Sequence, residues 1–251
     1  MACAKTPGFW YSGILAMHFT FRHRSGARQR RTRANSLAVT TYSQLLILLV
    51  KTNAANDKYA YVWRKFCFAT WWHPPNTLRV IGIDLPLESR VWIEQSLARL
   101  TAAEFAVHPF AIHVVLMEHM IEVYDHAVWF WRDNIRNIER TRSARRQDPD
   151  HVEMHEVSRH AVHSLDMLDM ALIVVSSMLD EHKRFLDERP SLLPDIVSGV
   201  RATSRTLRYQ MTVLQSLRGR ALAMQTRLSN EINPALAGMG SNDEDTRWVM
   251  V

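Results

Sequence analysis

The side chains that could bind a metal ion gather in two clusters. The first combines three carboxylates, Glu118, Glu122 and Asp125, with His119 and His126. Spacings of four and three place the carboxylates on one helix face, where their oxygens could ligate a divalent cation. The alternative is a solvated face opposite an apolar seam, as solubility demands. We expect these carboxylates to form a solvated face and not a cation site. We assign no metal ligand in this chain.

The second cluster is rich in histidine, and its members are His151, Glu153, His155, Glu156, His160 and His163. Residues one helical turn apart, such as His151 and His155, are compatible with a zinc or iron site. A di-iron bundle, however, needs Glu-x-x-His pairs on two helices. Neither that pattern nor His-Glu-x-x-His occurs here. We therefore expect these residues to be histidines on a helix surface.

Motifs of covalent or phosphate chemistry are missing from the sequence. It contains no Gly-rich phosphate loop, no Ser-centred elbow and no Cys/His pairing. Its two cysteines, Cys3 and Cys67, are too few for a disulfide framework or a four-cysteine metal site, which indicates a reducing compartment. We expect no enzymatic activity and assign no catalytic or cofactor-binding residue.

Three long helices must position these clusters, because apolar residues recur at steps of three and four through residues 108–234. Asp148-Pro149-Asp150 and Pro190 separate the helices. The seams include Met117, Tyr124 and Trp131, then Leu168, Val175 and His182, then Leu207, Gln210 and Leu214. Such narrow seams predict helices packed along their length. The polar seam residues His182 and Gln210 either fix register or oligomeric state, or face a water-filled gap between subunits.

A small β element is predicted before the helices. Residues 59–72 and 78–85 are apolar or β-branched and flank a turn with two prolines, Pro74 and Pro75, which favours two short strands. A lone hairpin is only marginally stable, so it must pack on helices or belong to a larger sheet. A short helix is predicted over residues 87–105, with Val91, Ile93, Leu97 and Leu100 packing inward.

The net charge of +6 is confined to the N-terminal part of the chain. Residues 1–56 carry eight basic and no acidic side chains, which leaves 23 basic and 25 acidic residues in 57–251, a net charge of −2. The helical part therefore shows no charge signature of nucleic-acid binding. The N-terminal composition resembles that of a transit peptide, but it forms no clean amphipathic helix, and we expect a solvated segment.

The predicted fold class is mainly α: a long antiparallel helical bundle or coiled-coil stalk of three long helices, with a small β element and a short helix before it. Four regions follow from this. Residues 1–56 are a basic, poorly ordered segment, 57–107 a small α+β element, 108–234 the stalk domain, and 235–251 a flexible tail after Pro234 ends the last helix. No apolar run reaches the ~20 residues that a membrane-spanning helix needs.

Short strings in residues 60–233 form a recognisable combination. In the β element and the first long helix they are WHPPN (72–76), DLP (84–86), HPFAIH (108–113), YDHAVW (124–129) and RD (132–133). In the later helices they are RHAVHS (159–164), EH (181–182), FLDERP (185–190) and NEIN (230–233). Together they resemble the cytoplasmic region of fungal CorA-like magnesium transporter proteins.

The resemblance implies a pentameric transporter of divalent cations such as Mg²⁺, whose stalk helix continues into two membrane helices with a Gly-Met-Asn signature. Gly238-Met239-Gly240 is not that signature, and no membrane helix precedes it. We therefore expect a cytoplasmic domain that does not conduct ions by itself, forms a homo-oligomer through its stalk helices, and reaches a membrane only through missing helices or a partner subunit. The alternative is a soluble coiled-coil interaction module with no transport role.

Overall fold

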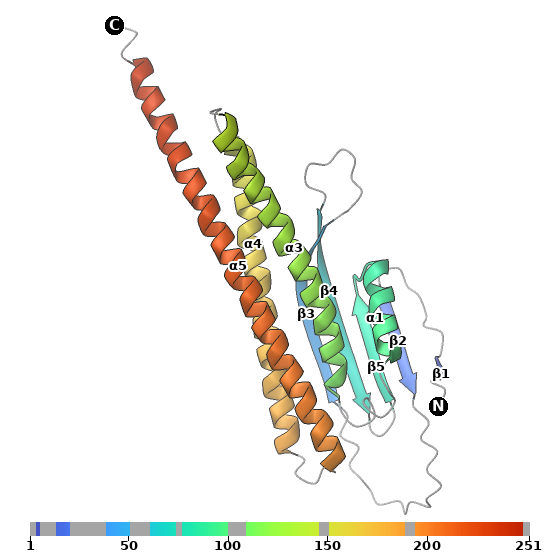
Figure 1. Ribbon diagram of the computed structural model, residues 1–251. Helices are drawn as coiled ribbons and strands as arrows, with labels where there is room; N and C mark the ends of the chain where they lie inside the picture. The colour runs from blue at the N-terminus through green and yellow to red at the C-terminus, as the bar shows by residue number, and fades with distance from the viewer. Residues whose placement is uncertain are drawn as a thin grey trace, which may run out of the picture.

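The computed structural model describes residues 4–5, 14–20, 39–50, 61–73, 77–99, 109–145, 151–188 and 194–247. The strands are β1 (Ala4–Lys5), β2 (Ile14–Thr20), β3 (Val39–Val50), β4 (Tyr61–His73) and β5 (Thr77–Ile83). The helices are α1 (Leu87–Arg99), α3 (Ala111–Arg145), α4 (His151–Asp187) and α5 (Pro194–Arg247). The long helices lie on one side of the sheet (Figure 1).

The three long helices confirm the predicted bundle. α4 runs opposite to both α3 and α5, so helices consecutive in the sequence are antiparallel (Figure 1). The predicted seam positions are buried between them, for example Trp131 at 0%, Leu168 at 0% and Leu214 at 0% exposed. The same hydrophobic core includes Phe66 of β4 and Ile93 of α1. Because a single core joins bundle and sheet, the helices are not a separate rod.

The predicted hairpin forms, and it lies within a larger sheet. β4 and β5 pair in antiparallel register, with Cys67 opposite Ile83 and Trp72 opposite Leu78. Among the described residues the strand order is β1-β2-β5-β4-β3. β3 pairs with the free edge of β4, and β2 with the free edge of β5. Both edges of a marginal hairpin are thereby covered.

Alternating side chains give the sheet one covered face. On β5, Leu78 and Val80 are buried while Arg79 and Ile83 are exposed. This period of two is what a sheet with helices on one face requires. On α1, Ile93 and Leu97 are buried as predicted, but Val91 is 42% exposed. The prediction for Val91 was wrong, because residues two apart cannot share one narrow helix face.

The structure corrects the expectation that residues 1–56 are a poorly ordered segment. This stretch contributes β1, β2 and β3 to the sheet. The strand β2 overlaps one apolar run of this stretch, and the second half of β3, residues 45–50, is the other. A strand that joins an open sheet edge gains backbone hydrogen bonds along the side that faces its neighbour. The intervening Arg-rich residues lie outside the described part of the chain.

The structure also corrects the expected end of the last helix. α5 continues through Pro234 to Arg247, so residues 235–247 are helical and not a tail. Proline removes one backbone hydrogen bond and costs about 3 kcal/mol in a helix interior. A helix of 54 residues can tolerate that loss because its other bonds and its packed seam remain. As a result, α5 reaches beyond α3 and α4 at its C-terminal end (Figure 1).

Among the described helices, α4 is long and apolar enough to span a membrane, contrary to the expectation from sequence. Within Val152–Asp187 an 18-residue window reaches a mean hydropathy of 1.5, and 33% of that window is buried inside the structure. Core helices of soluble proteins have the same composition. Here Leu168 and Val175 pack in the bundle core, and Asp169 forms an ion pair with Arg218 of α5. Packing between helices therefore accounts for part of the hydropathy of α4, while Met170 and Ile173 remain exposed.

Candidate functional site

The carboxylates and histidines of the α3 cluster do not converge on a common binding site. Glu118 and Glu122 are exposed, and Asp125 accepts a hydrogen bond from the indole Nε1 of Trp129 at 3.0 Å. His126 is exposed, whereas His119 is only 6% exposed and turns away from the solvated face. Throughout the described residues, no group of three His, Cys, Asp or Glu side chains is close enough to hold a metal ion.

His119 is a core residue. Its ring stacks on Trp92 of α1 with centroids 4.8 Å apart. Its Nδ1 lies 3.9 Å from Glu122 Oε2, and within the described structure neither ring nitrogen has a hydrogen-bond partner. Burial lowers the pKa of His119 from 6.5 to about 4. His119 therefore joins α1 to α3 as a neutral ring.

The buried histidine makes stability depend on pH. Above pH 6.5 the His119 ring is neutral in the folded and the unfolded chain. Between pH 6.5 and about 4 only the unfolded chain takes up the proton, so the free energy of unfolding falls as the pH falls. We expect His119→Phe, which keeps the stacking on Trp92, to reduce this slope by up to about 1.4 kcal/mol per pH unit. Urea unfolding at a series of pH values between 4 and 7 measures the slope.

The matched control is His126→Phe, which removes an exposed histidine from the same helix. Its profile should follow that of the unmodified chain. Because burial also lowers the pKa of His113 from 6.5 to about 4, some acid sensitivity remains in His119→Phe. Identical slopes for His119→Phe and the unmodified chain would show that His119 is not buried.

The members of the α4 histidine cluster also lie in different surroundings. His155 and His163 are exposed, and the side chain of His151 lies outside the described residues. His160 is buried, which corrects the expectation of a surface residue. Its ring stacks on Trp131 of α3 at 4.5 Å between centroids and 7° between planes, and on Trp63 of β4 at 6.0 Å. The imidazole thus lies between two indoles from different elements.

Polar contacts hold His160 in this position. Its Nε2 lies 3.0 Å from Glu156 Oε1, and Arg159 forms an ion pair with the same glutamate. Burial lowers the pKa of His160, and the Glu156 carboxylate acts in the opposite direction. The Arg159 hydrogen bond, followed by that of His160, lowers the pKa of Glu156. These contacts orient the His160 ring for packing between the two indoles.

The two polar seam residues are buried as expected, at 1% exposure for His182 and 5% for Gln210. The Gln210 side chain donates a hydrogen bond from Nε2 to the backbone oxygen of Val114, at 2.8 Å. This contact joins α5 to α3 within one chain and fixes the register of the two helices. The His182 ring packs against Phe110 at 5.4 Å. Neither contact supports an assignment to a gap between subunits.

A small pocket that was not predicted from the sequence lies between α3 and α5. It has a volume of about 170 Å³ and is lined by Val128, Trp129, Arg132, Arg220, Ala223, Met224 and Arg227. Guanidinium groups lie over the Trp129 ring, Arg132 at 4.0 Å and Arg220 at 5.4 Å. Cations over an indole face are attracted to its electron density.

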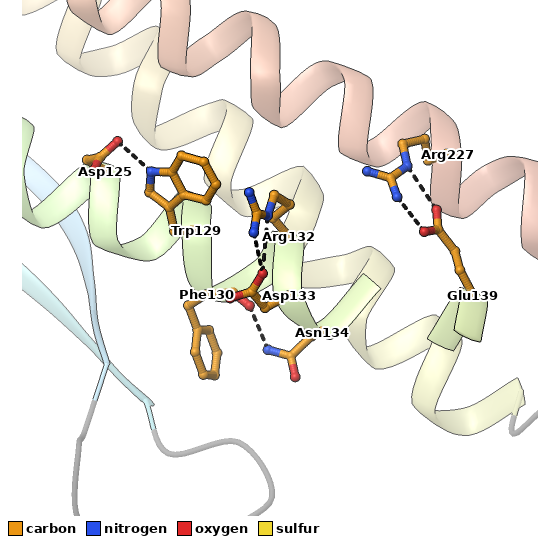
Figure 2. A network of polar contacts seen from close by, with 8 residues as sticks. All are labelled: Asp125, Trp129, Phe130, Arg132, Asp133, Asn134, Glu139 and Arg227. Carbon is orange, nitrogen blue, oxygen red and sulfur yellow. Dashed lines mark hydrogen bonds and ion pairs between the residues drawn. The ribbon is translucent and has the colours of Figure 1, made fainter. Parts of the chain in front are cut away.

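Three residues of this pocket, Trp129, Arg132 and Arg227, take part in the polar contacts drawn in Figure 2. Arg132 pairs with its neighbour Asp133, and Arg227 of α5 forms a two-pronged ion pair with Glu139 of α3. The pocket lining contains three arginines and no carboxylate, so it offers no side-chain oxygen to a metal cation. The contacts instead connect α5 to α3 halfway along the stalk. The only signal in the sequence was aromatic and basic residues at helical spacing, which is also common on solvated faces.

Comparison with known proteins gives distant similarities. No protein-family model matches the chain. The chain is 24% identical over 215 residues to the "Notoamide biosynthesis cluster protein M'" of Aspergillus versicolor. That alignment covers 79% of this chain and 45% of the other protein, so the chain spans less than half the length of this curated relative. Among solved structures, the ZntB cytoplasmic domain from Vibrio parahaemolyticus aligns over 76% of this chain and 69% of its own, with 8% identity and a TM-score of 0.39.

Proposed function

We propose that this chain is the cytoplasmic helical domain of a CorA-like relative of divalent metal ion transporters, with Mg²⁺ as the transported or regulatory ion. The observation that carries the proposal is α5. This single helix of 54 residues packs in the bundle along its N-terminal part and then reaches past α3 and α4 (Figure 1). At 1.5 Å per residue it is about 80 Å long, which suits a stalk better than a compact bundle.

The family resemblance agrees with this fold in a specific way. Residues from the resembling strings lie in the core, among them Phe110, Tyr124, His160, His182 and Phe185. Three of them form one cluster, since Phe110 contacts both His182 and Phe185 at ring distances of 5.4 and 5.8 Å. A close-packed core is sensitive to changes of side-chain volume, so such residues are part of what specifies the packing. The strings therefore support a common packing and do not assign an ion site.

In the proposed function, transport also requires membrane-spanning helices. The sequence contains neither the Gly-Met-Asn signature nor two apolar helices beyond α5. We propose that membrane attachment and conduction depend on such helices in a longer form of the protein or in a partner subunit. The chain by itself is then expected not to transport.

We further propose that copies of the chain assemble through the stalk. Large apolar side chains remain exposed on α4 and α5, including Met170 at 51%, Ile173 at 57% and Tyr209 at 68%. A second copy that covered them would remove apolar surface from water. The same exposed residues favour the second candidate function, a coiled-coil interaction module that binds another protein and has no role in transport.

One experiment tests the proposal against this alternative. The native transcript is sequenced past the codon for Asn233, and its product and the 251-residue chain are each expressed in cells that lack magnesium uptake. We expect the transcript to encode two apolar helices with Gly-Met-Asn between them and its product to restore growth at low Mg²⁺. The 251-residue chain alone should not restore growth, and sedimentation should give it a mass above the 29.1 kDa of one copy.

The opposite result would overturn the transport proposal. A transcript that ends after Val251, with no rescue by any product, would leave the interaction module as the function. A mass of 29.1 kDa at all concentrations would remove self-assembly from the proposal.

A further inference from the structure

The arginines of α5 differ in their contacts along the length of the helix. Residues 196–230 contain six arginines and no Asp or Glu. The three arginines of the C-terminal half contact other helices: Arg218 pairs with Asp169, Arg227 pairs with Glu139, and Arg220 lies beside Trp129. The three arginines of the N-terminal half are Arg201, Arg205 and Arg208. Within the described part of the chain, none of these three forms an ion pair.

These three arginines line one groove. Spacings of four and three place Arg201, Arg205 and Arg208 on the same face of α5. The groove has a volume of about 820 Å³, and its remaining lining residues are Leu186 of α4 and Val197, Ser198 and Ser204 of α5. All three arginines are exposed, so their guanidinium groups are open to a dissolved ligand. Three like charges on one face repel each other in the free protein.

The chemistry of the lining suits phosphate. A guanidinium group presents parallel N–H donors that match two oxygens of a phosphate. Ser204 belongs to the same lining, and its hydroxyl is a further hydrogen-bond donor. Leu186 and Val197 are half-buried and add apolar surface beside the charged groups. A chain of two or three phosphates could contact all three arginines at once and relieve their repulsion.

Arg208 also influences the adjacent core. Burial is the main reason why the pKa of His182 is low, and the Arg208 charge lowers it further, while a hydrogen bond with the Val200 backbone opposes both. An anion on Arg208 would weaken this effect. The groove therefore lies in electrostatic contact with the seam between α4 and α5.

We propose that this groove binds an oligophosphate anion in solution, of the kind carried by a nucleoside triphosphate. A phospholipid headgroup has related chemistry, but two observations favour the dissolved anion. The groove lies at the end of the bundle where α4 ends and α5 begins, opposite the C-terminal end of α5 (Figure 1). Its apolar residues, Leu186 and Val197, are half-buried and do not protrude as they would to enter a bilayer.

The test is calorimetric titration of the purified chain with ATP and with inorganic triphosphate at moderate salt. We expect saturable binding of both. Arg205→Gln should weaken it about tenfold, and the combined variant Arg201→Gln, Arg205→Gln, Arg208→Gln by more than about a hundredfold, because each guanidinium supplies charge-assisted hydrogen bonds. Arg220→Gln is the matched control: it removes an exposed arginine from the same helix outside the groove, and the affinity should stay within about twofold.

Three results would overturn the inference: no binding of either anion, equal weakening by Arg220→Gln and Arg205→Gln, or binding to vesicles of anionic phospholipid without binding of the dissolved anions. Far-ultraviolet circular dichroism checks that each variant is folded, and glutamine at exposed helical positions should leave the spectrum unchanged. The preference for a dissolved anion over a lipid headgroup rests on the proposed function, which puts the membrane at the C-terminal end of α5. Binding of the anion itself is measured on the chain alone and does not need that function.

Discussion

Leu214→Asp is expected to lower the free energy of unfolding by about 4 kcal/mol, among the largest effects of any single change in this chain. Leu214 is 0% exposed and lies in the core that joins bundle and sheet. One turn before it, Gln210 bonds to α3, and one turn after it, Arg218 pairs with Asp169 of α4. Leu214 therefore occupies the layer where α5 meets both other long helices, and a carboxylate there would be buried without a partner.

Urea unfolding followed by circular dichroism measures this effect. Gln215→Asp, at the exposed neighbouring position, is the control and should change stability by less than about 1 kcal/mol. If Leu214→Asp does not fold at all, Leu214→Ala gives the measurement, with an expected loss of about 2 to 5 kcal/mol from the cavity. An unchanged midpoint in Leu214→Ala would place Leu214 outside the packed seam.

Trp131→Ala is expected to lower the free energy of unfolding by about 3 to 5 kcal/mol. Trp131 is 0% exposed and is among the largest fully buried side chains. It stacks on His160, and Phe130 contacts it edge-on at 4.9 Å. The Trp131 indole thus links α3 to α4. His160 in turn stacks on Trp63 of β4 and links α4 to the sheet. Loss of Trp131 would leave a large cavity and one face of the imidazole without contacts.

Trp129→Ala is the matched control, because it removes the same side chain two positions away. Trp129 is 37% exposed, and its contacts are a hydrogen bond to Asp125 and the two guanidinium groups. Such exposed contacts contribute about 1 kcal/mol or less each. Chemical denaturation of both variants provides the comparison. Equal losses for the two tryptophans would contradict the central position of Trp131.

The helical architecture could be predicted because its cause is local. The seam through Tyr124, Leu168 and Leu214 repeats at steps of three and four, and any helix with that repeat must bury that face. The hairpin of β4 and β5 could be predicted for a similar reason, since a proline turn and two alternating strands are neighbours in the sequence. Burial of Gln210 in the seam followed from its register alone.

The full sheet could not be predicted because its pairings are distant in sequence. β2 pairs with β5 across more than fifty residues, with Ile14 opposite Ile83. Nothing near Ile14 indicates that partner. Basic residues around the apolar runs of residues 1–56 concealed two strands, and Pro234 suggested a helix end that the rest of α5 overrides. In each case a local signal was outweighed by interactions formed elsewhere.

The sequence by itself determined which residues form the three long helices and which faces of those helices are apolar. It did not determine the surroundings of the chemically active side chains. Only the tertiary structure decided that His160 lies between Trp131 and Trp63, and that Arg201, Arg205 and Arg208 line one groove, in which none of them forms an ion pair with another described residue. The physical reason is that helical periodicity depends on residues three and four apart, whereas burial and ion pairing depend on the element that packs opposite.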